Sequence, residues 1–185
     1  LFMMPRLGFN NTYAIAVRRE TANLLKGKTI GALGGQEDLK VVFSHEFLER
    51  PDGWTGLSRR YGLSFSVSGI EHGLAYRALA DGVIDVTDAY STDGELERYD
   101  LVLLDDSLSF FPNYFAVPLV RASWASDKEN SPILRVIEKL SGEIDDATMR
   151  SLNAQVVSEG ITYQRVARAF VLQKGFVADG VIKAE

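Results

Sequence analysis

The first 110 residues alternate between short apolar blocks and longer segments of mixed polarity. Each block is rich in β-branched or large aliphatic residues and is bounded by turn-forming residues, which is typical of short buried strands. In the first block, Tyr13, Ile15 and Val17 fall on one face because side chains alternate along a strand. The pattern predicts strands at residues 12–17, 39–43, 65–67, 83–86 and 100–104.

The segments between these strands have the spacing and end signals of helices. Ser44 can cap a short helix that ends at the turn 51–53, and Gly62 can end the amphipathic segment before it. Because strands and helices alternate, we expect an α/β fold with a mostly parallel sheet. Helices are predicted at residues 19–25, 45–50, 54–61 and 74–79, with a further helical turn at 30–33.

The pattern changes after residue 104. Residues 105–120 contain Pro112 and Pro118, which are incompatible with a continuous helix, so an extended segment is expected. Residues 173–185 have a weak pattern and are expected to fray. Three amphipathic helices are predicted between these segments, and they begin near Pro132, at Asp145 or Asp146, and at Thr162, which is expected to cap the third.

Residues 83–96 are a candidate ligand site. The strand ends in a polar turn around Tyr90, and Ser91, Thr92 or Asp93 can cap a helix that follows. Open α/β sheets place ligands where a strand gives way to a helix N-terminus. The turn offers an aromatic face and a hydroxyl at such a place, although Tyr90 alone is equally compatible with a structural role.

Composition narrows the class of protein. The chain has 185 residues, of which 46% are hydrophobic and 24% charged, which suits a globular protein with a substantial core. A net charge of −5 without a Lys/Arg cluster argues against nucleic acid as a partner. Cysteine is absent, which excludes disulfides and thiolate sites, and no apolar run reaches the length of a membrane span. Residues 1–11 lack the pattern of a signal peptide.

No catalytic set stands out among the polar residues. The two histidines, His45 and His72, lack zinc-protease spacing, and neither a phosphate-binding glycine loop nor a nucleophile elbow is present. Glu46 with Glu49 is compatible with acid–base chemistry, but this pattern is more typical of a solvated surface. The same holds for residues 105–106 as a cation site. We therefore expect a binding protein rather than an enzyme, with no cofactor and no metal.

Three tyrosines suggest a different chemistry. Tyr13, Tyr90 and Tyr114 each lie at a strand end or in the extended segment rather than in a helix stripe. Aromatic faces carry negative potential and bind quaternary ammonium groups. Arg50, just before the turn 51–53, offers a planar fork suited to a carboxylate. The sequence alone does not show that these side chains converge.

Five segments carry a more specific pattern: GFNNTYAIAVRRE, FSHEFLERPDGW, GLAYRALADGVIDVTDAYSTDGEL, YDLVLLDD and FFPNYFAVPLVR. In order and spacing, from residue 7 to about residue 172, they resemble the osmoprotectant solute-binding proteins of ABC importers. That family takes up glycine betaine, choline, carnitine and similar compounds, and a related branch takes up ergothioneine.

The resemblance implies a periplasmic-binding-protein type II-like α/β fold, in which two lobes joined by two crossing segments close on the ligand. Residues 1–13 would hold the first crossing segment, with the crossing itself at 8–13, and residues 110–118 the second. Residues 14–109 would form one complete α/β lobe, the second lobe. Residues 119–185 would form the C-terminal helical part of the other lobe.

The resemblance also implies a site. By motif, Tyr13, Tyr90 and Tyr114 would form an aromatic cage, Arg50 would be a polar ligand contact, and Asn11 would contribute a backbone carbonyl. The implied partners are a small quaternary-ammonium ligand and the membrane permease of an ABC importer, with a periplasmic or cell-surface location.

One departure from the family concerns the first lobe. Its N-terminal part, which in the family supplies a further cage tyrosine and groups for the ligand's anionic end, has no counterpart in this sequence. The apolar faces at Val136 and Leu140 and at Val166 and Phe170 would then be exposed unless a preceding segment or a second copy of the chain covers them. The sequence leaves open a ligand-sensing domain in a receptor or permease fusion, including one for ergothioneine, and a fragment that binds nothing. An enzyme using Glu46, Glu49 or Asp105 is a further alternative.

Overall fold

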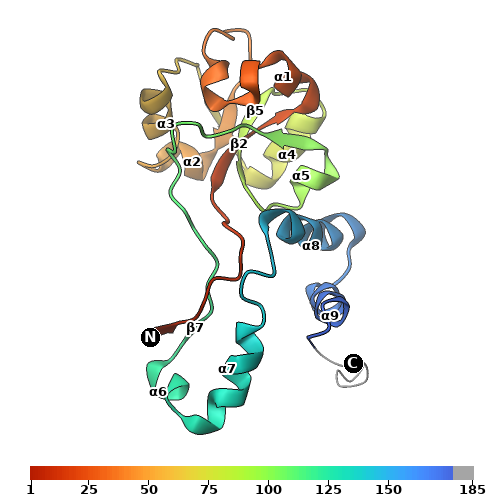
Figure 1. Ribbon diagram of the computed structural model, residues 1–185. Helices are drawn as coiled ribbons and strands as arrows, with labels where there is room; N and C mark the ends of the chain where they lie inside the picture. The colour runs from red at the N-terminus through yellow and green to blue at the C-terminus, as the bar shows by residue number, and fades with distance from the viewer. Residues whose placement is uncertain (177–185) are drawn as a thin grey trace.

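The computed structural model describes residues 1–176. Figure 1 shows an α/β body at the top and two extended segments that leave it together toward the N-terminus and β7 (Leu119–Val120). Helix α7 (Ser131–Glu138) lies at the far end, whereas α8 (Asp146–Glu159) lies directly below the body (Figure 1). The chain therefore leaves the body after its last strand and later returns to it.

The central strand of the body is β2 (Tyr13–Arg18). It lies between β5 (Val86–Tyr90) and β6 (Leu101–Leu103) and is antiparallel to both. The predicted mostly parallel sheet is therefore wrong for β2. β2 enters the body straight from an extended segment and lies between β5 and β6 in the direction opposite to both.

The other half of the sheet is parallel. β3 (Val42–Ser44) pairs with β4 (Ser68–Ile70) in the same direction, and a parallel bridge between Val41 and Val86 joins this pair to β5. Four strands thus share one direction, as expected from the alternation of strands and helices.

Helices surround this sheet, and two predicted end signals are confirmed. The Ser44 hydroxyl accepts a hydrogen bond from the Phe47 amide at 3.1 Å, and Gly62 ends α3 with a φ of 66°. The helical elements of the body are α1 (Arg19–Leu24), η1 (Lys26–Lys28), η2 (Ile30–Leu33), α2 (His45–Glu49), α3 (Trp54–Tyr61), α4 (His72–Ala80) and α5 (Glu95–Arg98).

Two strands lie later in the chain than predicted. The strand expected at residues 65–67 is β4, three residues further on, and the strand expected at 83–86 is β5. Tyr90 is therefore the last residue of a strand, where its backbone is fixed by β2, rather than a turn residue.

The predicted side-chain cap of α5 is wrong, because Gly94 occupies the N-cap and no side chain caps the helix. The candidate side chains make tertiary contacts instead. Ser91 donates to the Asn10 carbonyl at 2.6 Å, and Thr92 donates to the Asn11 side chain at 2.8 Å. These two bonds tie the turn after β5 to the first extended segment.

β2 divides the core into two clusters. Its large residues Tyr13, Ile15 and Val17 face one cluster, which includes Phe43 and Phe47, so the predicted shared face is confirmed. Ala16 faces the other cluster, where Tyr76, Leu79 and Leu96 pack. Because β2 is buried on both sides, its position is fixed by packing as well as by hydrogen bonds.

Residues 105–120 contain no helix, as predicted, and residues 114–120 run antiparallel to residues 2–11. Asn10 bridges to Phe115, and the Leu7 amide donates to the Ala116 carbonyl at 2.9 Å. At the far end, β1 (Phe2–Met3) pairs with β7. The two segments therefore form one narrow antiparallel connection (Figure 1).

Three predicted helices follow as α7, α8 and α9 (Tyr163–Gln173), and α6 (Ala122–Ala125) and η3 (Lys128–Asn130) precede them unpredicted. Asp145 caps α8 by accepting from the Thr148 amide at 2.8 Å. Thr162 occupies the N-cap of α9 without a side-chain bond, so its predicted capping contact is wrong. Most of the segment 173–185 lies outside the described residues.

α8 packs against the body at α5. A Cβ on Gly94 would lie 2.6 Å from the Ala154 amide nitrogen, so the contact requires glycine. Arg150 and Asn153 donate to the carbonyls of Ser91 and Thr92, each at 2.8 Å. This contact places the start of α8 beside the turn that follows β5.

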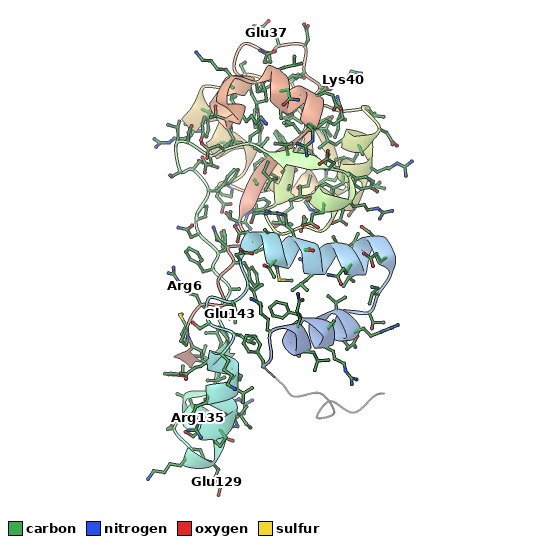
Figure 2. All side chains as sticks on the ribbon, turned by 45° about the vertical axis from the view of Figure 1, so that its right-hand side comes forward. Arg6, Glu37, Lys40, Glu129, Arg135 and Glu143 are labelled. Atoms are coloured by element: carbon green, nitrogen blue, oxygen red, sulfur yellow. The ribbon has the colours of Figure 1, made fainter. Side chains whose placement is uncertain are left out.

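The apolar face of α9 is covered, contrary to prediction. Val166 and Phe170 are 5% and 7% exposed, and Figure 2 shows α9 lying along α8 with side chains between them. At α7, Val136 is 52% exposed, as predicted, whereas Leu140, just after the helix, is half-buried. Among the described residues, no helix is both long and apolar enough to cross a membrane.

Candidate ligand-binding site

Tyr13 and Tyr90 form the centre of the site. They are register partners at the first position of β2 and the last position of β5, so their side chains point to the same face of the sheet. Their ring centroids lie 4.8 Å apart at 38°, and their hydroxyl oxygens are 3.2 Å apart. Phe47 and Phe111 pack on Tyr13, with centroids at 5.3 and 6.3 Å. The core therefore holds Tyr13, which is 6% exposed, and Tyr90 is the more exposed ring of the pair.

All five residues predicted for the site line one pocket of about 190 Å³. Tyr114 reaches it from the second extended segment and is 46% exposed. The sixth lining residue, Glu46, was not predicted. The binding role of the five predicted residues stays a prediction. The lining residues are Asn11, Tyr13, Glu46, Arg50, Tyr90 and Tyr114.

Glu46 joins the two tyrosines. Its carboxylate accepts from the Tyr13 hydroxyl at 3.0 Å and from the Tyr90 hydroxyl at 3.3 Å. Burial above all, followed by the hydrogen bonds to Tyr90 and Glu46, raises the pKa of Tyr13 well above its usual range. Burial likewise raises the pKa of Tyr90. Both tyrosines therefore stay neutral and keep their hydroxyl protons as donors. The available sequence signal was the position of Glu46 one helical turn before Arg50.

Arg50 is already paired. Its Nε and Nη2 donate to the two oxygens of Asp52 at 2.8 and 2.9 Å, and its Nη1 lies 3.7 Å from Glu46. The guanidinium carbon is 5.6 Å from the centroid of the Tyr13 ring. The planar fork that suits a ligand carboxylate is thus occupied by an acid of the same turn.

A buried acid beneath the pocket positions both strands and helix α2. Asp88 is fully buried and accepts from the Ser44 amide at 2.5 Å and from the Ser44 hydroxyl at 2.7 Å. Since Ser44 caps α2, Asp88 connects β5 with the helix that carries Glu46 and precedes Arg50. The Asp88 side chain thereby links the tyrosine strand to the charged wall of the pocket.

His72 forms an ion pair with Asp88. Its Nδ1 lies 3.5 Å from Asp88, its Nε2 lies 3.3 Å from Asp93, and its ring centroid is 5.0 Å from that of Tyr90. The hydrogen bonds to Asp88 and Asp93 raise the pKa of His72 to about 10, although burial acts in the opposite direction. The imidazole is therefore a cation packed against the back of Tyr90.

This arrangement predicts a specific dependence of stability on pH. Because the pKa of His72 is higher in the folded state, its contribution is complete below about pH 6.5 and is lost as the pH rises toward 10. The free energy of unfolding, measured with urea, is expected to fall by up to about 1.4 kcal/mol per pH unit in this window. His72→Gln should remove this part of the slope, and an identical slope in both proteins would contradict the ion pairs.

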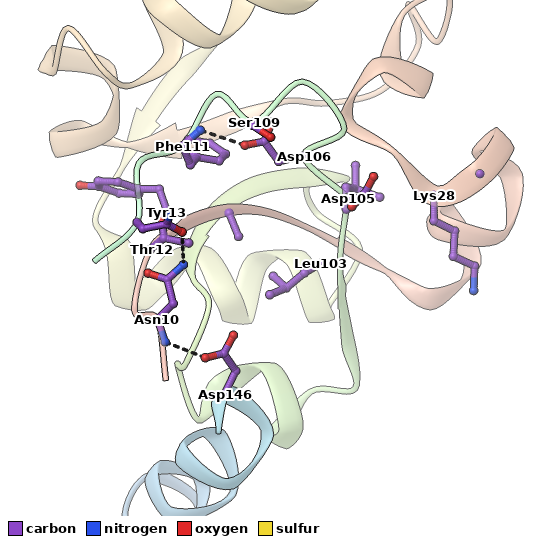
Figure 3. Close-up of a pocket in the computed structure, with 14 residues that line it drawn as sticks. Asn10, Thr12, Tyr13, Lys28, Leu103, Asp105, Asp106, Ser109, Phe111 and Asp146 are labelled. Atoms are coloured by element: carbon purple, nitrogen blue, oxygen red, sulfur yellow. Dashed lines mark hydrogen bonds between the residues drawn. The ribbon is translucent and has the colours of Figure 1, made fainter. Parts of the chain in front are cut away.

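A second, larger hollow lies beside the extended segments. This groove has a volume of about 620 Å³. Figure 3 shows residues that line it, with Asn10 bonded to Asp146 at one end and Lys28 at the other. Asp106 accepts from the Tyr61 hydroxyl at 2.5 Å and from the Phe111 amide at 2.8 Å, so its carboxylate is committed to the fold. Within residues 1–176 no group of three His, Asp or Glu side chains is placed to hold a metal.

A mixed sheet with an antiparallel central strand, two adjoining extended segments and a pocket at their junction define the class, a type II periplasmic binding protein. The chain belongs to the family described as the substrate binding domain of ABC-type glycine betaine transport system (OpuAC), whose model matches residues 2–173. The resemblance carried by the five segments is confirmed. This family consists of substrate-binding domains of transport systems and not of enzymes.

Three relatives illustrate the similarity. A glycine-betaine-binding protein of Pseudomonas aeruginosa is 34% identical over 185 residues, which is 93% of this chain and 59% of that protein. The carnitine transport binding protein OpuCC of Listeria monocytogenes is 34% identical over 94% of this chain and 56% of its own length. The ergothioneine transport permease/ergothioneine binding protein EgtU of Helicobacter pylori is 32% identical over 95% of this chain and 32% of its own length.

Two solved structures of related proteins have a similar fold. The crystal structure of a glycine betaine/carnitine/choline ABC transporter superimposes with a TM-score of 0.83 at 33% identity, covering 94% of this chain and 64% of the other. Apo YehZ from Escherichia coli gives 0.77 at 26% identity, covering 95% and 66%. The chain thus spans between a third and three fifths of the curated relatives named above, and about two thirds of the solved chains.

Proposed function

We propose that this chain captures a small quaternary-ammonium compound for an ABC importer. The observation that supports the proposal most directly is the pocket in which Tyr13, Tyr90 and Tyr114 gather around a carboxylate. Each aromatic face contributes about 0.5–2 kcal/mol to binding a cation, depending on how far the contact is desolvated. The glycine betaine, carnitine and choline named for relatives all carry such a group.

The pocket residues have separate roles in this proposal. Tyr13 and Tyr90 present ring faces to the methylated ammonium, and Glu46 holds both hydroxyls in place while adding negative charge. Tyr114 closes the pocket from the second extended segment, and Asn11 offers a backbone carbonyl beside it. Because Asp52 holds the Arg50 fork, Arg50 acts chiefly on the shape and charge of the wall.

The domain plan follows the family. Residues 1–13 and 110–118 are the crossing segments, residues 14–109 are one complete lobe, and residues 119–185 belong to the other lobe. Closure of the two lobes buries the ligand and presents the protein to a membrane permease outside the cytoplasm. A preceding segment, or a second copy of the chain, completes the first lobe.

Isothermal titration tests this proposal. The chain should bind choline, glycine betaine, carnitine or ergothioneine saturably, and should not bind ethanolamine or glycine, the unmethylated counterparts of the first two. The methyl groups decide the outcome because they spread the charge over an apolar surface that fits aromatic faces. A folded sample that binds none of the four quaternary compounds would contradict the proposal.

A second candidate is a binding domain fused to its own permease, with ergothioneine as ligand. The observation that favours it is the Helicobacter pylori relative, whose name combines a permease with a binding protein and of which this chain covers 32%. Saturable binding of ergothioneine alone among the four ligands would support this candidate over the first.

A further inference from the structure

The charge of the pocket distinguishes between two ligand classes that the family name groups together. Four acids lie in or directly behind the pocket, namely Glu46, Asp52, Asp88 and Asp93, and two cations, Arg50 and His72, lie among them. Each cation is held by carboxylates on two sides, because Arg50 lies between Asp52 and Glu46, and His72 between the other two. Two negative charges are therefore in excess around the tyrosine pair.

The hydrogen bonds that Arg50 already makes determine which of its N–H donors are available to a ligand. Its Nε and Nη2 form the paired edge that grips a carboxylate, and both already donate to Asp52. The remaining nitrogen, Nη1, lies 3.7 Å from the Glu46 carboxylate. A ligand carboxylate approaching Arg50 would have to displace Asp52 or lie beside Glu46, and both arrangements bring two carboxylates together.

We infer that Glu46 is a specificity-determining residue, and that the site prefers a quaternary ammonium compound with net positive charge over a zwitterion that carries a carboxylate. This inference rests on the proposed function. Glu46 attracts the ammonium of either ligand, but it repels the carboxylate of the zwitterion, so the preference has an electrostatic origin. The Glu46 side chain is 59% exposed, so salt should weaken the preference.

Choline and glycine betaine are suitable probes because they share the trimethylammonium head and differ in a hydroxyl against a carboxylate. The chain is expected to bind choline at least about tenfold more tightly than glycine betaine at low salt. Glu46→Gln removes the charge and keeps the shape of the side chain; its oxygen can accept from one tyrosine hydroxyl and its amide can donate to the other, so it should reduce this ratio about tenfold. Asp52→Asn frees the Arg50 fork and should tighten glycine betaine selectively.

Glu49→Gln is the matched control. It removes the same charge from the same helix, at an exposed residue that does not line the pocket, and should leave the ratio unchanged. Circular dichroism and thermal melts establish that each variant is folded. A tighter complex with glycine betaine in the parent chain, an equal loss for both ligands in Glu46→Gln, or the same change in Glu49→Gln would each overturn this inference alone. Absence of binding to both probes, carnitine and ergothioneine would overturn the proposed function with it.

Discussion

Replacement of Asp88 by alanine is expected to lower the free energy of unfolding by about 3–5 kcal/mol, a large fraction of the stability of a typical domain. Asp88 is fully buried and accepts hydrogen bonds from the Ser44 amide and hydroxyl, and it faces the charged His72 ring. Alanine would leave the Ser44 amide without its acceptor and would remove one of the two carboxylates that balance the imidazolium. Urea unfolding followed by circular dichroism measures the loss.

Asp81→Ala is the matched control for this substitution. Asp81 is paired with Arg77 four residues earlier on α4, at the surface, where such a pair contributes about 0.3–0.5 kcal/mol. Its removal should change stability by less than about 1 kcal/mol. If the two variants lost the same small amount, the buried connection between β5 and α2 would not hold the site together.

Replacement of Tyr90 by alanine is expected to weaken binding of a quaternary ammonium ligand about 10- to 30-fold. The change removes one ring face, worth up to about 2 kcal/mol when desolvated. It also removes the ring that lies 4.8 Å from Tyr13 and the hydroxyl that bonds Glu46. Isothermal titration gives the affinity, and a thermal melt of the same samples separates a binding defect from unfolding.

Two further tyrosine variants show whether the weaker binding comes from loss of the Tyr90 ring or of its hydroxyl. Tyr90→Phe keeps the ring face and should bind within about threefold of the parent chain, since it loses only the hydroxyl contacts with Tyr13 and Glu46. Tyr163→Ala removes a tyrosine that is 69% exposed on α9 and should leave the affinity unchanged. An affinity of Tyr90→Ala within a factor of two of the parent chain would show that the ring is not part of the ligand cage.

Local signals in the sequence were sufficient for the elements of the body. The Ser44 cap, the end of α3 at Gly62 and the inward face of β2 follow from the chemistry of a few neighbouring residues. The cap of α5 could not be predicted in this way. Ser91 and Thr92 are good capping residues, but their hydroxyls bond residues 10 and 11, about 80 positions away in the chain.

The arrangement of the site depends on similar long-range pairing. The register that places Tyr13 opposite Tyr90 joins strands far apart in the chain, and periodicity does not encode it. The motifs of the family nominated Asn11, Tyr13, Arg50, Tyr90 and Tyr114, which the structure brings into one pocket. They did not nominate Glu46, for which the local signal is its position one helical turn before Arg50.

Local sequence patterns also did not identify the charged residues behind the pocket. Asp88 is an acid within a strand, and it is buried inside β5 because Ser44 and His72 satisfy its oxygens. The burial of Val166 and Phe170 was missed for a related reason. The periodicity of α9 shows which face is apolar, but it does not show that α8 covers that face.

The most direct test of the aromatic site is a nuclear Overhauser measurement on the chain saturated with choline or glycine betaine, whichever binds. The N-methyl protons should give cross-peaks to the ring protons of Tyr13 and Tyr90, and their bound signal should shift upfield because they lie over ring faces. Binding without any contact between the N-methyl protons and these two rings would contradict the account and would place the ligand elsewhere on the molecule.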